Sequence, residues 1–231
     1  MNVLLHRPNI LTMTLVRLKN LYNIFVLARK LKKVHISKML KMRTKIYKSE
    51  YSTLYMINGV YHREDGPAYV TAEGEQWYCG GHYHRENGPA IIVGVSKADP
   101  CGTTQYWYKF GKLHRRGGPS VMYKDGTLKW HVNGKLHRRD GPALIDKTGS
   151  YWYVNDNLHR KNGPAVELKD GTEEWYYKGA RHRDKGPAVR NAEMEQWWHS
   201  GVLHRSDGPA VIHADGTRDW YYNGYPSKAL Y

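Results

Sequence analysis

One short motif recurs seven times along the chain, and it constrains the fold more than any other feature of the sequence. In each copy a His-Arg pair is followed within a few residues by Gly-Pro. The histidines of the seven pairs are His62, His84, His114, His137, His159, His182 and His204. They are 22 or 23 residues apart, except for one step of 30 residues. A fixed period of this length indicates a repeat protein in which each unit stacks on its neighbours.

Aromatic residues follow the same period. Each copy runs to a tryptophan: Trp77, Trp107, Trp130, Trp152, Trp175, Trp197 and Trp220. We expect these tryptophans to form the core. The next residue in six copies is again aromatic: Tyr78, Tyr108, Tyr153, Tyr176, Trp198 and Tyr221. Because adjacent strand residues point to opposite faces, this second row is predicted to be an exposed binding surface, unless the N-terminal segment or the curvature of the sheet covers it.

The fourth copy shows how one repeat would fold. Residues 127–132 are rich in strand-forming residues, and 135–138 return after Asn133-Gly134, a pair typical of a type I′ hairpin turn. A second turn at 139–141 leads to Pro142, which can begin a strand because its missing N–H is tolerated there. This pattern predicts two short strands per repeat.

The period also decides between repeat architectures. A propeller blade needs about 40 residues, so units of 22–23 residues are too short to be blades. We therefore predict an all-β repeat array over residues 51–231, an elongated antiparallel sheet of β-hairpins with about fourteen strands and a length of roughly 65 Å. The longer step indicates an insertion near 96–102, and no stretch within 51–231 supports a helix.

The positive charge is concentrated in the first 50 residues. This segment holds 12 Lys and Arg and one acid, Glu50, out of a net charge of +15 for the chain. Apolar residues at helical spacing predict a partly helical, basic, amphipathic arm with its helix at about 9–33. The basic residues expected to bind a partner are Arg17, Arg29, Lys30, Lys32, Lys33, Lys41, Arg43, Lys45 and Lys48. The arm is either an ordinary helix docked on its own repeat domain or an anchor into a partner, which would be an acidic protein surface, a nucleic acid or a membrane face.

The repeated histidines suggest either a metal ladder or a structural role. Equivalent positions lie two strands apart, about 10 Å, which is too far for two imidazoles to share one zinc ion. We therefore expect each histidine to hydrogen-bond a turn, and we expect no metal and no cofactor.

The repeated arginines form a second ladder of like charges. They are Arg63, Arg85, Arg115, Arg138, Arg160, Arg183 and Arg205. We expect either pairing with nearby acids or contact with an anionic partner such as phosphate. No nucleophile stands beside a base at a unique position, so the sequence does not predict an enzyme or a small-molecule substrate.

The consensus Trp-Tyr-x-Asn-Gly-x-Leu-His-Arg-x-Asp-Gly-Pro-Ala resembles the MORN-variant repeats found in proteins of bacteriophages and large DNA viruses. The resemblance covers residues of about 51–225, and seven copies agree with it. It implies a β-hairpin array that serves as a scaffold for contacts with proteins or lipids and has no enzymatic activity. The His-Arg-x-Asp-Gly-Pro segment departs from ordinary MORN repeats, so their lipid binding transfers poorly.

Together these features predict a structural protein of a virion or of the infected host cell interior. The basic arm would anchor it in a capsid or other particle, and the hairpin array would cement neighbouring proteins. The alternative is a nucleic-acid-associated protein that places the arm and the arginine row on phosphates. Attachment to a membrane surface is a weaker expectation. A mitochondrial transit peptide is the minority interpretation of the N-terminus.

Overall fold

The computed structural model describes residues 44–94 and 102–228. These residues form thirty β-strands and no helix. The described part of the chain therefore contains no membrane-spanning helix. The helix expected at about 9–33 and most of the insertion near 96–102 lie outside the described residues. By its internal contacts the chain divides into two units, residues 1–45 with 57–59 and residues 46–56 with 60–231. The second unit contains the repeats except for residues 57–59 of the first one.

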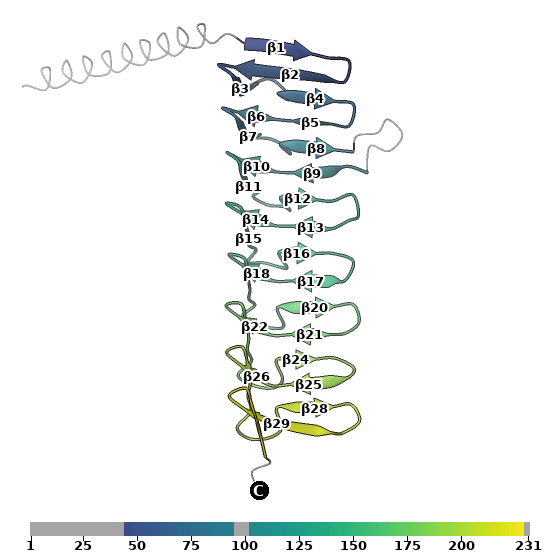
Figure 1. The fold of residues 1–231 in the computed structure, drawn as a ribbon, viewed down its shortest axis with the longest axis vertical. Helices are drawn as coiled ribbons and strands as arrows, with labels where there is room; N and C mark the ends of the chain where they lie inside the picture. Colours follow the sequence, from purple (N-terminus) through teal and green to yellow (C-terminus); the bar gives the residue numbers. More distant parts are fainter. Residues whose placement is uncertain (1–43, 95–101, 229–231) are drawn as a thin grey trace, which may run out of the picture. The chain divides into compact units, whose positions relative to one another are not determined.

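One long antiparallel sheet runs through all the repeats, as the sequence predicted (Figure 1). Its strands pair in sequence order, each with the one before and the one after. These strands are β2 (Ser52–Ile57), β4 (Tyr69–Thr71), β5 (Gly74–Gln76), β8 (Ile91–Val93), β9 (Thr104–Tyr106), β12 (Val121–Met122), β13 (Leu128–Lys129), β16 (Leu144–Ile145), β17 (Gly149–Tyr151), β20 (Val166–Leu168), β21 (Glu173–Glu174), β24 (Val189–Arg190), β25 (Met194–Gln196), β28 (Val211–His213) and β29 (Arg218–Tyr222). The exposed strand β1 (Thr44–Lys48) pairs with β2.

A second row of short strands lies along one edge of this sheet, as separate two-stranded hairpins (Figure 1). The hairpins are β6 (Tyr78–Cys79) with β7 (His82–Tyr83), β10 (Tyr108–Lys109) with β11 (Lys112–Leu113), β14 (His131–Val132) with β15 (Lys135–Leu136), β18 (Tyr153–Val154) with β19 (Asn157–Leu158), β22 (Tyr176–Tyr177) with β23 (Ala180–Arg181), and β26 (Trp198–His199) with β27 (Val202–Leu203). At the two ends, β3 (Val60–Tyr61) pairs with β2 and β30 (Tyr225–Ser227) pairs with β29. A complete repeat therefore contributes four strands, and the expectation of two strands was wrong.

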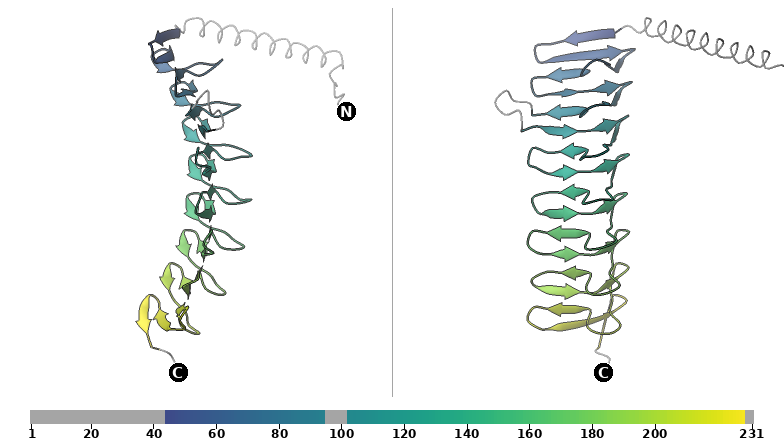
Figure 2. Two further views of the ribbon diagram at one scale, coloured as in Figure 1. Left: turned by 90° about the vertical axis from the view of Figure 1, so that its right-hand side faces the viewer. Right: turned by 180° about the vertical axis from the view of Figure 1, so that it is seen from behind.

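The chain changes its pairing partner at each tryptophan, which is why the strands are so short. The N–H of Trp77 donates to the carbonyl of Ala90 at the end of the long-sheet pairing, 2.7 Å away. The carbonyl of Trp77 accepts from the N–H of His84, which closes the hairpin. The same two bonds recur at the later tryptophans up to Trp197. Seen from the side, each repeat projects a loop from the same side of the sheet (Figure 2).

The hairpin turns have the predicted type I′ geometry. Both central residues have positive φ, for example 52° at Asn133 and 88° at Gly134. Three turns place a residue other than Asn, Asp or Gly in the first position: Phe110, Lys178 and Ser200, with φ between 46° and 50°. At the opposite edge of the sheet, Asp125 accepts a hydrogen bond from the Thr127 N–H at 2.9 Å and closes a turn of another kind.

The fully buried core consists of small residues together with Val121. The alanine of each Gly-Pro-Ala has no exposed surface: Ala68, Ala90, Ala143, Ala165, Ala188 and Ala210. Ser120 takes this place in the third repeat and is also fully buried. The tryptophans are only half-buried, so the expectation that they form the core was wrong in part. The alanine backbone bonds the sheet through its N–H and the N–H of a tryptophan through its carbonyl, as Ala90 does with Tyr106 and Trp77.

The aromatic residues that follow the tryptophans are not an exposed row. Tyr78 is 8% exposed, and the other members are half-buried. Burial raises the pKa of the phenols of Tyr78, Tyr108, Tyr153 and Tyr176. The ring of Tyr78 lies 4.9 Å from that of Tyr61 in the preceding hairpin, and the ring of Tyr83 lies 5.2 Å from that of Tyr108 in the following one. These rings pack hairpin on hairpin, so the hairpins themselves cover the row that the sequence suggested as a binding surface.

Candidate functional site

The arginine of each His-Arg pair lies between an aromatic ring and a glycine. In the second repeat, Cζ of Arg85 is 3.8 Å from the centre of the Trp77 ring. A Cβ atom built on Gly88 would lie only 2.9 Å from the same Cζ, so the guanidinium occupies the space that a side chain would need. The Nη1 of Arg85 donates to the carbonyl of Pro89 at 3.2 Å. The motif therefore encodes one compact stack of tryptophan, arginine and Gly-Pro.

The same stack is present in every repeat. The distance from Cζ to the ring centre lies between 3.8 and 4.3 Å for Arg63 over Tyr55, Arg85 over Trp77, Arg115 over Trp107, Arg138 over Trp130, Arg160 over Trp152, Arg183 over Trp175 and Arg205 over Trp197. Each of these arginines also donates to its own proline carbonyl. The arginine row is thus held by contacts within the chain. A cation over a desolvated aromatic face is worth about 1–2 kcal/mol.

Acidic partners complete the stack in only some repeats. The Nε of Arg63, Arg138 and Arg205 donates to the aspartate two residues later, at 2.8 to 3.1 Å. This hydrogen bond holds the pKa of Asp65, Asp140 and Asp207 below its usual value. Arg160 pairs with Glu167 instead. Within the described residues Arg85, Arg115 and Arg183 have no carboxylate in ion-pair contact.

Each repeated histidine joins its repeat to the next one. The Nδ1 of His62 accepts the backbone N–H of Gly80, the first residue of the next hairpin turn, at 3.0 Å. The histidines at 84, 114, 159, 182 and 204 accept from the equivalent turn residue, and His137 contacts the side chain of Asn155 there. The second turn residue donates to the carbonyl just before the histidine, as Gly81 does to Tyr61 at 2.9 Å. The prediction that the histidines bond turns is confirmed, and the turn belongs to the neighbouring repeat.

The outward face of the hairpins is where the repeats differ. Its cross-strand pairs are Cys79 with His82, Lys109 with Lys112, Val132 with Lys135, Val154 with Asn157, Tyr177 with Ala180, His199 with Val202, and Tyr222 with Tyr225. No residue type is common to all these positions, whereas the residues that hold the stack are nearly constant. A constant framework with a varied surface is what a binding scaffold built from repeats presents.

Rings form a continuous row on the outer side of the C-terminal hairpins. Neighbouring ring centres are 4.7 to 6.1 Å apart along the series His159, Tyr177, His182, His199, His204 and Tyr222. Tyr177 and Tyr222 are 52% and 55% exposed, and Val202 beside them is 41% exposed. We call this series the ring row. Exposed aromatic side chains such as Tyr177 and Tyr222 are typical of a protein contact surface.

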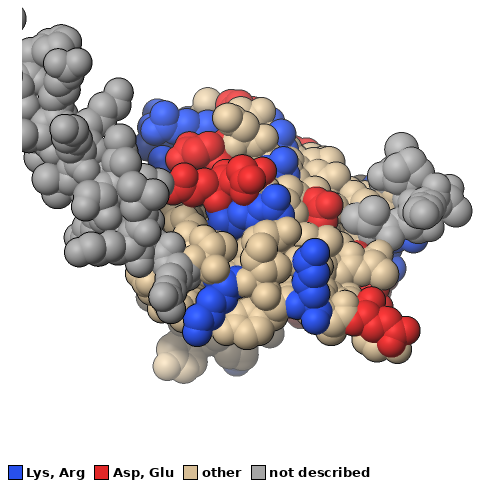
Figure 3. Space-filling model, turned by 90° about the horizontal axis from the view of Figure 1, so that it is seen from above, with Lys and Arg blue, Asp and Glu red and all other residues tan. Residues whose placement is uncertain are grey.

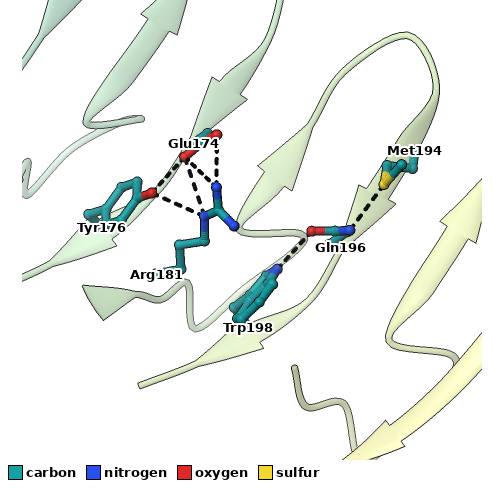
Figure 4. Close-up of polar contacts among 6 residues, drawn as sticks. All are labelled: Glu174, Tyr176, Arg181, Met194, Gln196 and Trp198. Atoms are coloured by element: carbon teal, nitrogen blue, oxygen red, sulfur yellow. Dashed lines mark hydrogen bonds and ion pairs between the residues drawn. The ribbon is translucent and has the colours of Figure 1, made fainter. Parts of the chain in front are cut away.

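An internal polar network replaces apolar packing in the sixth repeat (Figure 4). Arg181 stands at the position of the usual leucine and donates to both carboxylate oxygens of Glu174 at 3.2 Å. The hydroxyl of Tyr176 donates to Glu174 at 2.7 Å and accepts from Arg181 at 3.0 Å. In the next repeat, Trp198 donates its ring N–H to Gln196 at 3.0 Å. These groups satisfy one another inside the fold, which marks them as structural.

Clefts open between consecutive repeats, and their charge differs. The cleft between the first and second repeats has a volume of about 440 Å3 and is lined by Arg63 and Arg85 but also by Glu64, Asp65 and Glu86. The cleft between the second and third repeats has a volume of about 510 Å3. Its charged lining residues are Arg85, Lys109, Arg115, Arg116 and Glu86. The second cleft is therefore strongly basic.

Charge is also uneven along the array as a whole. Residues 103–165 carry 12 Lys and Arg against 4 Asp and Glu, whereas 51–102 carry 3 against 6 and 166–231 carry 9 against 10. Seen from the end where β1 lies, acidic and basic side chains lie next to one another on the surface (Figure 3). A count of charged residues in each repeat would have revealed the basic segment 103–165 from the sequence. The larger positive charge of residues 1–50 concealed it.

The arm residues singled out from the sequence are only partly described. Lys45 and Lys48 lie on the exposed strand β1. Arg17, Arg29, Lys30, Lys32, Lys33, Lys41 and Arg43 lie outside the described residues. Among the residues that the structure describes, no group of three or more His, Cys, Asp or Glu side chains could hold a metal ion.

No protein-family model matches the chain, and no curated protein matches it. The class of protein is thus defined by the structure itself: a β-hairpin repeat protein with one long antiparallel sheet.

Proposed function

We propose that this protein is a non-enzymatic, MORN-like interaction scaffold of a larger assembly such as a virus particle. The observation that carries the proposal is the division of labour within each repeat. The repeated Trp, Arg, His and Gly-Pro residues make contacts inside the chain, while the outward hairpin positions vary. A surface that varies on a constant framework serves recognition rather than stability.

The ring row is the surface best suited to a protein partner. It contains the exposed Tyr177 and Tyr222, and exposed Val202 lies across the hairpin from its member His199. Aromatic residues are enriched at the buried centre of protein interfaces. Acidic and basic residues are nearly balanced in residues 166–231, so charge would not dominate contacts at this end. The basic arm would supply a second attachment to the assembly.

The test uses tagged full-length protein that is expressed with the rest of the assembly. We expect the intact chain to co-sediment with the particle, and Y177S/Y222S to lose most of this association because two exposed rings are removed from one contact. The matched control is Val132→Ser, which changes the position equivalent to Tyr177 in a central hairpin. Deletion of residues 1–45 tests the arm separately.

Two results would overturn the proposal. Y177S/Y222S could co-sediment as the intact chain does, which would remove the ring row as the contact. Enzymatic turnover of any substrate by the purified chain would contradict a purely structural role.

A further inference from the structure

The hairpin of the third repeat has an arrangement that costs stability. Lys109 lies directly opposite Lys112 across strands β10 and β11. Like charges at directly opposite positions destabilise a hairpin. Both side chains are exposed, and neither has a carboxylate in ion-pair contact within the described part of the chain. Other repeats avoid this repulsion, for instance with Val154 opposite Asn157.

The turn between these lysines is also strained. Phe110 occupies the first turn position with φ of 46°, where the preceding repeat has glycine and the following repeat has asparagine. Bulky residues are disfavoured in this backbone region. The Phe110 ring stacks on the His84 ring, with 4.1 Å between the ring centres and 10° between the ring planes. Phe110 nevertheless remains 57% exposed. One ring face is thus supported by His84, and the opposite face is open.

The basic cleft adjoins this hairpin. Lys109 lines it together with Arg85, Arg115 and Arg116, and His84, which carries the Phe110 ring, lines it too. The one acid in the lining, Glu86, contacts His84 at 3.1 Å. Burial lowers the pKa of Arg115, in keeping with a guanidinium that has no anion beside it. The Phe110 ring, supported by His84, therefore belongs to the hairpin that borders a cleft whose arginines and lysine have no carboxylate in ion-pair contact within the described residues.

We propose that this cleft and the tip of its hairpin bind single-stranded nucleic acid. Lys109, Lys112 and Arg116 would contact successive phosphates, and a base would stack on the open face of Phe110. Cationic grooves with aromatic platforms are how proteins hold single strands without sequence preference. An acidic peptide would use the cations but would give the strained aromatic residue no role. The arginine row contributes only Arg85 and Arg115, whose guanidiniums are already stacked on tryptophans.

The experiment measures binding of a fluorescent single-stranded oligothymidylate to the full-length chain by anisotropy. Phe110→Asn removes the platform and relieves the turn, so it should fold at least as well as the parent chain while binding at least about fivefold more weakly. K109Q/K112Q/R116Q should weaken binding at least about tenfold and flatten its salt dependence. The matched control, K124Q/K147Q/K169Q, removes three exposed charges at turns on the opposite edge of the sheet and should change affinity less than twofold.

A second measurement is independent of any binding by the arm. Ultraviolet crosslinking to a bromouridine-containing strand should map to the peptide that contains Phe110, and Phe110→Asn should abolish that crosslink. Unchanged affinity in both cleft variants would overturn the proposal. The proposal would also be overturned if the control variant lost as much affinity as the cleft variants. The same holds if polyglutamate competed as effectively as the unlabelled strand. Either result would show a general attraction between charges.

Discussion

The guanidinium of Arg85 lies 3.8 Å from the centre of the Trp77 ring, and the arginine stands eight residues after the tryptophan. This spacing crosses the hairpin, so the contact folds the loop back onto the strand that precedes it. Gly88 permits the contact because it has no side chain in the space of the guanidinium. One stack thus explains why arginine, glycine and tryptophan recur together.

The stack makes the glycine before each proline sensitive to substitution. We expect Gly88→Ala to lower the free energy of unfolding by about 1–3 kcal/mol, because its Cβ would overlap the guanidinium of Arg85. Urea denaturation of the full chain measures this change. In an Arg85→Ala background the same substitution should cost less than about 1 kcal/mol, since the clash is gone. Equal costs in both backgrounds would show that the glycine serves another purpose.

The hairpin turns allow a stabilising substitution. Lys178 has φ of 50°, and Lys178→Asn should raise the free energy of unfolding by about 1 kcal/mol because asparagine tolerates this region better. The backbone N–H that donates to His159 is kept. The matched reverse change is Asn133→Lys, whose N–H donates to His114 in the same way and which should cost a similar amount. Thermal unfolding that moves in the same direction for both variants would contradict this explanation.

The buried His131 predicts a specific response to pH. Burial lowers its pKa below the ordinary value of about 6.5, and its Nδ1 lies 2.8 Å from the Ser120 hydroxyl. The unfolded chain therefore binds the proton first as pH falls. The contribution of His131 to stability is complete above about pH 6.5 and decreases below it, by up to about 1.4 kcal/mol per pH unit.

The variant S120A/H131Y isolates this response, because it restores the alanine and tyrosine that most other repeats have at these positions. We expect its free energy of unfolding to fall less between pH 7.5 and 5.5 than that of the parent chain. The two proteins differ in no other histidine, so the difference reports on His131. An identical pH response in the two proteins would rule out the assigned role.

The ion pair of Glu174 and Arg181 predicts that a second substitution restores the stability lost in a first one. Arg181→Leu restores the usual hairpin residue but leaves a largely buried carboxylate without its cation, which should cost about 1–3 kcal/mol. E174Q/R181L should recover most of this loss, because glutamine already accepts from the ring residue in two other repeats. A double-mutant cycle by urea denaturation gives the coupling energy. Additive effects would show that the two residues act independently.

Some of the fold could be predicted from particular residues and some could not. Asn133-Gly134 predicted its turn because the preference for positive φ is local. Trp130 was expected to lie in a continuous strand, but its N–H bonds Ala143 and its carbonyl bonds His137, so the strand is divided there. Strand-forming propensity cannot show such a change of partner, because the residues before Trp130 and the residues after it are equally typical of a β-strand. The acidic partner expected for Arg138 is present as Asp140, but its stack on the Trp130 ring and its bond to the Pro142 carbonyl were out of reach, because no local pattern marks a ring or a carbonyl as the partner of an arginine.

The sequence by itself determined the period, the turn types and the all-β class, because these follow from residues close together in the chain. Only the tertiary structure decided what is buried and what is free. It placed the alanines in the core, covered the tyrosines that follow the tryptophans, stacked the arginines on rings and left the Lys109–Lys112 hairpin open. The reason is geometric: the hairpins pack on one another rather than extending the long sheet, and this packing joins residues about 20 positions apart.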